Sequence, residues 1–322
     1  MIRLILLSSG VLLLITHKYL AAISVQSQSI AFFLGIILLG VPHGAADLLV
    51  ATKHSVEQNK QFSKVIFLSK YLFRLILFGI VLYFFPLVGN LLFMLFAAYH
   101  FGETDLHQFK TSTIAGIAFV TSYGLLILGV ILLNHFEEVK PLLQLFDAGI
   151  RHGDFIQFLE TNKYVILSFL GILFFASTFC YFYTSEIPDR NKERFLIQFA
   201  LILFILYYLP MLLGFTFYFV VWHSVLSLGN IVKYLRKDGS VSLRLVIKQM
   251  LLYSTMAMAG IIIFGLTGFM FTNNSTIMVY VFLGLAVLTA PHMQVMQLMY
   301  QSIRTRTLVI NNNEILPASK PA

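Results

Sequence analysis

The stretch GVPHGAADLL, residues 40–49, places a proline, a histidine and an aspartate inside an apolar run that extends from about residue 30 to residue 50. The whole chain of 322 residues is 58% hydrophobic and 11% charged, with a mean hydropathy of +0.85. Soluble domains carry about 25% charged residues, so this composition predicts an all-α, polytopic integral membrane protein. The net charge of +8 does not indicate nucleic-acid binding, because the basic residues form no cluster on a soluble domain.

Apolar runs of about 20 residues predict about ten transmembrane helices. Their approximate limits are residues 2–23, 29–50, 64–88, 89–108, 113–134, 163–184, 194–212, 215–235, 245–271 and 277–300. If the spans alternate and the N-terminus is cytoplasmic, most of the 22 lysine and arginine residues fall in cytoplasmic segments, as the positive-inside rule requires. We therefore expect a multi-pass protein of the cell membrane, in contact with lipid, with both termini in the cytoplasm.

The spans predict a single transmembrane domain, residues 1–301. Its one long outer loop, residues 135–162, mixes apolar and charged residues and predicts one or two interfacial amphipathic helices. The C-terminal tail, residues 302–322, is polar and is predicted to be disordered. Because Cys180 is the only cysteine, the chain has no intramolecular disulfide and no cysteine-based metal site.

Five of the nine histidines fall at span ends or in loops, and the other four lie well inside predicted spans: His43, His100, His223 and His292. All four spans run from outside to inside, and each histidine precedes the next basic residue by ten to twelve positions. This spacing puts each histidine about 15 to 18 Å above its cytoplasmic basic residue. A single intramembrane histidine often only links two helices by a hydrogen bond. Four at one depth instead predict a shared metal centre, because buried ionisable groups need partners and imidazole binds first-row metals well.

Carboxylates follow two of these histidines at helical spacing. Asp47 lies four residues after His43, and Glu103 lies three residues after His100. Each pair therefore shares one face of its helix, where the carboxylate is suited to orient an imidazole N–H. Asp105 is interpreted differently, as a residue that approaches the cytoplasmic interface or pairs with a basic residue of the third span.

Prolines and aromatic residues suggest a cavity beside the histidines. Pro42 and Pro291 each precede a histidine, and the loss of one backbone donor predicts a bend in both helices. Tyr99, Phe219 and Trp222 lie within a turn of a histidine. They are candidate walls for a long apolar ligand, although ordinary helix packing uses the same residue types.

Four motifs, in this order along the chain, resemble those of the Brp and Blh family of bacterial and archaeal β-carotene 15,15′-dioxygenases. They are GVPHGAADLL (40–49), AAYHFGETD (97–105), VWHS (221–224) and TAPHM (289–293). The resemblance covers about residues 30–300. It implies a membrane enzyme with non-haem iron, Fe(2+), that cleaves β-carotene at its central double bond with O2. The product is two molecules of all-trans-retinal, so a functional link to a microbial rhodopsin is also expected.

The resemblance also assigns roles to single residues. His43, His100 and His223 match the family's iron-binding histidines, and His292 matches a further family motif. Family members carry another iron-binding histidine one turn after the tryptophan-linked one, as WHSxxH, where this chain has Ser227. A hydroxyl is a poor substitute for imidazole on iron(II). Three interpretations stay open: His292 completes the ligand set, three nitrogens hold the metal, or the chain is a divergent paralogue that acts on another polyene or has no turnover. The common depth favours His292.

Other classes of membrane protein would place or use such histidines differently. A bis-histidine haem protein with two stacked haems would place its ligands at two depths, whereas these four share one. A proton-coupled transporter would use the intramembrane His, Asp and Glu side chains as a relay, but the sequence has no convincing inverted repeats. A two-iron desaturase or hydroxylase requires HxxxH or HxxHH clusters, which this chain lacks. A structural protein that assists a rhodopsin is the remaining alternative.

Overall fold

The computed structural model describes residues 1–322 except residues 110, 146–151, 238, 240, 272–276 and 316–322. None of the described residues lies in a β-strand, and the regular elements are all helices, with three π-helical segments labelled η. In chain order they are α1 (Ile2–Ile15), η1 (Thr16–Leu20), α2 (Val25–Gly35), η2 (Ile36–Gly40), α3 (Val41–Gly44), α4 (Asp47–Glu57), α5 (Lys64–Phe84), α6 (Pro86–Asp105), α7 (Ile114–Leu133), α8 (Phe136–Leu145), α9 (His152–Thr184), α10 (Asp189–Tyr208), α11 (Met211–Phe215), η3 (Thr216–His223), α12 (Ser224–Arg236), α13 (Leu243–Phe271) and α14 (Ile277–Ile315).

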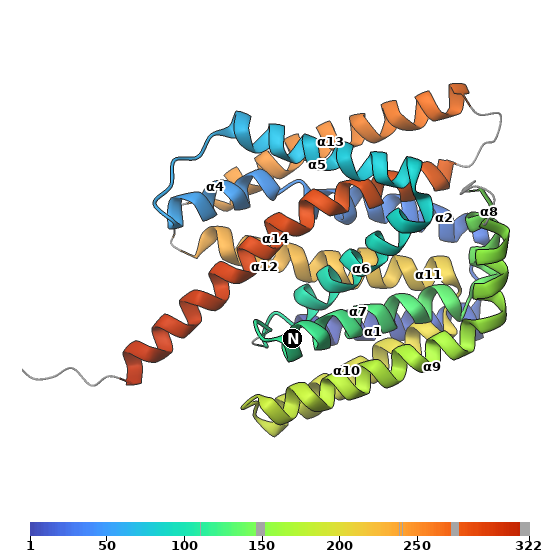
Figure 1. The fold of residues 1–322 in the computed structure, drawn as a ribbon, viewed down its shortest axis with the longest axis horizontal. Helices are drawn as coiled ribbons and strands as arrows, with labels where there is room; N and C mark the ends of the chain where they lie inside the picture. Colours follow the sequence, from blue (N-terminus) through green and yellow to red (C-terminus); the bar gives the residue numbers. More distant parts are fainter. Residues whose placement is uncertain (110, 146–151, 238, 240, 272–276, 316–322) are drawn as a thin grey trace, which may run out of the picture.

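The helices form one bundle (Figure 1), in which α9 and α10 lie on one side, α5 and α13 lie on the opposite side, and α14 crosses between them. Six helical stretches among the described residues are long and apolar enough to cross a membrane. They are Ile2–Leu20, Val25–Glu57, Lys64–Phe84, Ile114–Leu133, Gly153–Thr184 and Met211–Arg236. A helix covers most of each of the ten predicted spans. The number of ten spans and the cytoplasmic position of the termini stay predictions.

The outer surface of the bundle is apolar. On α5, for example, Val65, Leu72 and Phe73 each leave more than half of their surface exposed. A contiguous surface of this kind is unfavourable in water and suits the hydrocarbon of a bilayer. The all-helical architecture predicted from composition is therefore present, with a surface that fits a membrane protein.

Helices α6 and α7 pack unusually closely through glycines. A Cβ atom at Gly124 of α7 would collide with the carbonyl oxygen of Ala98, and one at Gly102 of α6 would collide with the carbonyl oxygen of Val120. Small residues allow two backbones to approach in this way, which replaces the hydrophobic driving force that lipid cannot supply. The contact fixes the position of α6, the helix that carries His100.

The predicted span 29–50 is a broken helix. It starts as α2, widens into the π-helical η2, continues as the short α3 and is interrupted by a turn at residues 45–46 before α4 begins. Pro42 explains part of this, because it cannot donate to the carbonyl of Leu38. Segment η3 is also π-helical and ends at His223. Single π-helical turns are often found at functional sites. Here η2 ends three residues before His43, and η3 ends with His223.

Helices occupy the described part of the predicted outer loop, and a helix also extends into the predicted C-terminal tail. Segment α8 and the first turns of α9 occupy the described part of loop 135–162, and salt bridges connect them, from Lys140 to Glu160 at 2.8 Å and from Lys163 to Glu137 at 3.2 Å. Helix α14 continues to Ile315, so it covers most of the tail 302–322 that was predicted to be disordered. Residues 316–322 lie outside the described residues.

Candidate metal centre

Four histidines from four different elements meet in the interior of the bundle. His43 comes from α3, His100 from α6, His223 from η3 and His292 from α14. Their ring centroids form a closed circuit, with separations of 5.5 Å from His43 to His223, 4.8 Å from His223 to His100, 5.0 Å from His100 to His292 and 5.1 Å from His292 to His43. Each of these residues is at most 5% exposed. The residues that the sequence places at one depth therefore do lie together.

The nitrogen atoms of this cluster suit a metal ion. One ring nitrogen each from His43, His100 and His223 lies within 4.8 Å of the other two. Both ring nitrogens of His100 and of His223, and Nε2 of His292, have no hydrogen-bond partner among the described residues. A buried polar atom without a partner costs about 1–3 kcal/mol, so five such atoms in one place require an explanation. A metal ion would take one nitrogen from each of these histidines, and the residues present therefore fit one.

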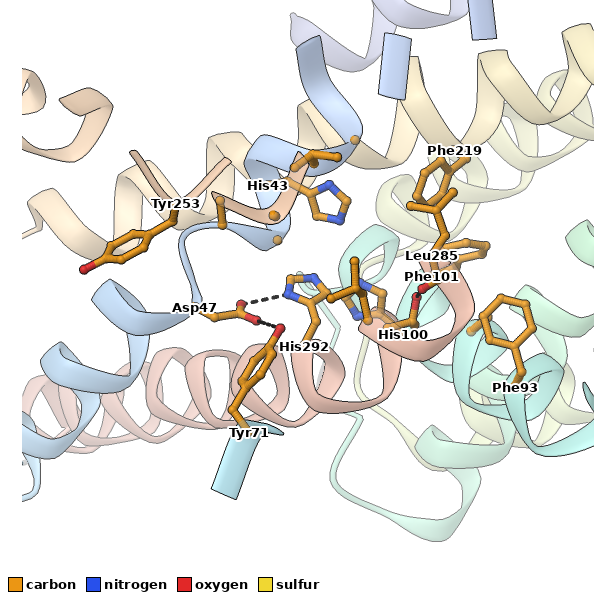
Figure 2. A pocket seen from close by; sticks show the side chains of 18 of the residues that line it. His43, Asp47, Tyr71, Phe93, His100, Phe101, Phe219, Tyr253, Leu285 and His292 are labelled. Carbon is orange, nitrogen blue, oxygen red and sulfur yellow. Dashed lines mark hydrogen bonds and ion pairs between the residues drawn. The ribbon is translucent and has the colours of Figure 1, made fainter. Parts of the chain in front are cut away.

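Asp47 orients His292 rather than His43. Oδ1 of Asp47 accepts a hydrogen bond from Nδ1 of His292 at 2.7 Å, and Oδ2 accepts one from the hydroxyl of Tyr71 at 3.0 Å (Figure 2). The expected pairing within one helix is absent because the turn at residues 45–46 separates His43 from Asp47. A carboxylate that holds one imidazole nitrogen leaves the other free for a metal, an arrangement common around metal-binding histidines.

His43 is held by its own neighbours. The hydroxyl of Ser224 donates to the carbonyl of Phe219 at 2.8 Å, so its oxygen is available to accept from Nδ1–H of His43 at 3.3 Å. The carbonyl of Leu39 lies 3.4 Å from the same nitrogen. With Nδ1 protonated for these contacts, Nε2 is the nitrogen of His43 that can bind a metal.

Glu103 also has a different partner from the one expected. Its Oε1 accepts from Arg304 at 3.0 Å and from the hydroxyl of Tyr99 at 3.2 Å, and it makes no hydrogen bond to His100 in the described structure. The cause is the packing of α14 against α6, which brings the guanidinium of Arg304 to this carboxylate. Glu103 therefore links two histidine-bearing helices, and Tyr99 is engaged in this link instead of lining the cavity.

Asp105 is buried rather than placed at the interface. Its Oδ2 accepts hydrogen bonds from Tyr123 at 2.8 Å, from Tyr218 at 2.9 Å and from the indole of Trp222 at 2.8 Å. The predictions that Asp105 pairs with a basic residue of the third span and that Trp222 lines the substrate cavity are both wrong. The sequence signal was weak, because only the tertiary structure brings these four residues together.

Ser227 lies one turn after His223 and is fully buried. Its hydroxyl has no hydrogen-bond partner among the described residues, and it is not part of the cavity wall. The position where the resembling family has a histidine is thus close along the helix to His223, but its side chain makes no polar contact with the histidine cluster here.

A cavity of about 310 Å³ adjoins the cluster. His43, His100 and His292 form part of its wall, and most of the remainder is apolar, including Phe93, Phe101 and Phe219 (Figure 2). Phe219, a candidate wall residue from the sequence, is part of this wall, and its contact with a substrate stays a prediction. Because three of the histidines stand in this mostly apolar wall, an apolar molecule bound there would lie against them.

The chain is similar to known proteins over most of its length. A family model described as beta-carotene 15,15′-dioxygenase matches residues 34–300, which include all four histidines. The chain is also similar to the beta-carotene 15,15′-dioxygenase of an uncultured marine bacterium, 66A03, with 23% identity over 279 residues, which cover 86% of this chain and 95% of the relative. No solved structure matches the chain.

Proposed function

Because the chain belongs to the beta-carotene 15,15′-dioxygenase family, we propose that it cleaves β-carotene at the central double bond with O2 inside the cell membrane. One carbon–carbon double bond breaks and two carbonyl groups form, each with one atom of O2, so that one β-carotene gives two all-trans-retinal molecules and no further oxidant is needed. The observation that carries the proposal is the set of unpartnered imidazole nitrogens beside an apolar cavity.

The four histidines would hold non-haem iron(II). Neutral imidazoles suit iron as well as zinc and copper, and the choice of iron comes from the family's chemistry rather than from the ligand set. Iron bound there would supply the redox chemistry that O2 requires. His292 completes the set in place of the histidine that Ser227 replaces, supported by its ring centroid lying 5.1 Å from that of His43 and 5.0 Å from that of His100 and by its hydrogen bond to Asp47.

The remaining task of the protein is to bind, orient and protect the polyene. The aromatic and aliphatic wall of the cavity would hold the chain of the substrate against the histidines and exclude water. An apolar substrate dissolved in the bilayer reaches such a cavity laterally, between helices. The retinal product would serve a microbial rhodopsin as its chromophore.

A divergent activity on another polyene is the second candidate, and Ser227 is the observation that favours it. This buried serine occupies the position of a family iron ligand without contacting the cluster. If the altered ligand set changes how the substrate sits, a different double bond or a different carotenoid is cleaved. The cavity wall and the histidine circuit are the same in both proposals.

Expression in a bacterial host that already makes β-carotene tests the proposal. Chromatography of cell extracts should show loss of β-carotene and two retinal molecules for each carotene consumed, beside an empty vector. His43→Ala, His100→Ala and His223→Ala should each lose bound iron and product while still inserting in the membrane. Intact β-carotene alongside well-inserted wild-type protein would reject this substrate, and the chromatogram of a host making other carotenoids would then decide for or against the second candidate.

A further inference from the structure

We propose that Asp105 is a positioning residue that connects α6 to η3 and thereby aims His223 into the metal centre. The proposal rests on the metal-binding part of the proposed function and not on the identity of the substrate. Asp105 is the last residue of α6, five positions after His100, and it is 1% exposed. It therefore lies on the helix that carries His100, and its hydrogen bonds reach residues that come just before His223.

The hydrogen bonds of Asp105 lead directly to His223. Two of the three donors on its Oδ2, Tyr218 and Trp222, belong to η3, the π-helical segment that ends at His223. The third donor, Tyr123, comes from α7, which carries no histidine. All three donors are at most 2% exposed. One carboxylate oxygen thus connects the residue directly before His223 to the helix of His100.

His223 needs such an external support more than the other histidines do. His43 is held through Ser224 and His292 through Asp47, whereas neither ring nitrogen of His223 has a hydrogen-bond partner among the described residues. Its ring packs against other rings, such as that of Phe101, with centroids 4.6 Å apart. A π-helical segment is a rare and poorly stabilised form of helix. The orientation of the His223 ring therefore depends on the hydrogen bonds of nearby residues of η3, Tyr218 and Trp222.

His100 shares this lack of a polar partner but has a rigid helix instead. Close backbone packing of α6 against α7 at Gly102 and Gly124 fixes its position. Through its hydrogen bonds to Tyr218 and Trp222, Asp105 holds η3 against this fixed helix. His100 and His223 are accordingly the closest pair in the circuit, with ring centroids 4.8 Å apart. Loss of the link should let η3 shift and remove His223 from the common centre.

Trp222 provides the readout, because it is the only tryptophan of the chain. Its indole N–H is bound to Asp105, and its neighbour in sequence is the candidate ligand His223. The metal-free full-length protein in lipid nanodiscs can therefore be titrated with Co²⁺, following both the quenching of Trp222 fluorescence and the visible absorption of the bound cobalt. The wavelength of Trp222 emission reports the hydrogen bond, and the cobalt absorption reports the number of nitrogen ligands.

Asp105→Asn keeps the shape of the side chain and removes its charge. We expect a shifted Trp222 emission, a loss of about tenfold or more in Co²⁺ affinity, in the range found for residues that support metal ligands, and a cobalt spectrum with one nitrogen ligand fewer. Tyr218→Phe should show a smaller change in the same direction. Tyr123→Phe is the matched control, because it removes the same kind of hydrogen bond from the same oxygen but on a helix without a histidine, and it should leave Co²⁺ affinity within about threefold.

Two results would overturn the proposal. The first is Asp105→Asn protein with a shifted emission but wild-type Co²⁺ affinity and spectrum. The second is an equal loss of affinity in Tyr123→Phe, which would mean general destabilisation. If Asp105→Asn does not fold, Tyr218→Phe removes only one hydroxyl donor on η3, and wild-type Co²⁺ affinity and spectrum in that variant also overturn the proposal. Wild-type protein that binds Co²⁺ without cleaving carotene rejects only the proposed reaction, whereas wild-type protein that binds no Co²⁺ rejects both.

Discussion

Replacing Asp47 with asparagine should weaken metal binding about ten- to hundredfold. The two oxygens of Asp47 accept from different donors, one from Nδ1 of His292 at 2.7 Å and the other from the hydroxyl of Tyr71 at 3.0 Å. Asparagine has only one acceptor oxygen, so one of the two donors must face the amide NH₂ group. A hydrogen bond to a charged group contributes about 1.5–3 kcal/mol, and about 1.4 kcal/mol corresponds to a factor of ten in affinity.

The same geometry predicts a rescue. Adding Tyr71→Phe to Asp47→Asn removes the competing donor, so that the amide oxygen can turn to His292 and hold its ring again. Metal affinity of the double variant should therefore exceed that of Asp47→Asn alone, while Tyr71→Phe alone should cost less than Asp47→Asn. The assay is the Co²⁺ titration of the metal-free protein, evaluated as a double-mutant cycle.

Two results would refute this reasoning. Wild-type affinity in Asp47→Asn would mean that Asp47 does not position a metal ligand, and the centre would then consist of His43, His100 and His223 alone. A double variant that binds no better than the single variant would mean that competition between the two donors is not the cause of the loss.

Two further predictions concern packing and the ligand set. Gly124→Ala should destabilise the protein by about 1–3 kcal/mol, because the new Cβ would collide with the carbonyl oxygen of Ala98. Thermal unfolding in detergent measures this effect, and Gly79→Ala on α5, where nothing lies within 4 Å of the added atom, is the control that should lose no stability. His292→Ala should lower the iron content of purified protein, and Ser227→His in that background should restore part of it, since it returns an imidazole one turn after His223. Full iron content in His292→Ala would contradict the four-histidine centre, and no gain from Ser227→His would show that position 227 cannot reach it.

Much of the fold and part of the site follow from the sequence, because they depend on local features of the chain. The length of an apolar run and the fixed rise of a helix are enough to predict helices near their observed positions. The same arithmetic predicts that His43, His100, His223 and His292 lie at one depth, and their rings do form one circuit. The motifs around them were also sufficient to indicate the family.

Only the tertiary structure decided what each polar side chain contacts. Helical spacing assigned Asp47 to His43, but a turn of two residues redirected it to His292, which is 245 positions away. Asp105 was interpreted as an interfacial residue, yet it accepts three hydrogen bonds in the interior. Spacing within a helix determines which face a residue occupies. The choice of partner depends on which helix packs against that face, and the sequence of one helix carries little information about that choice.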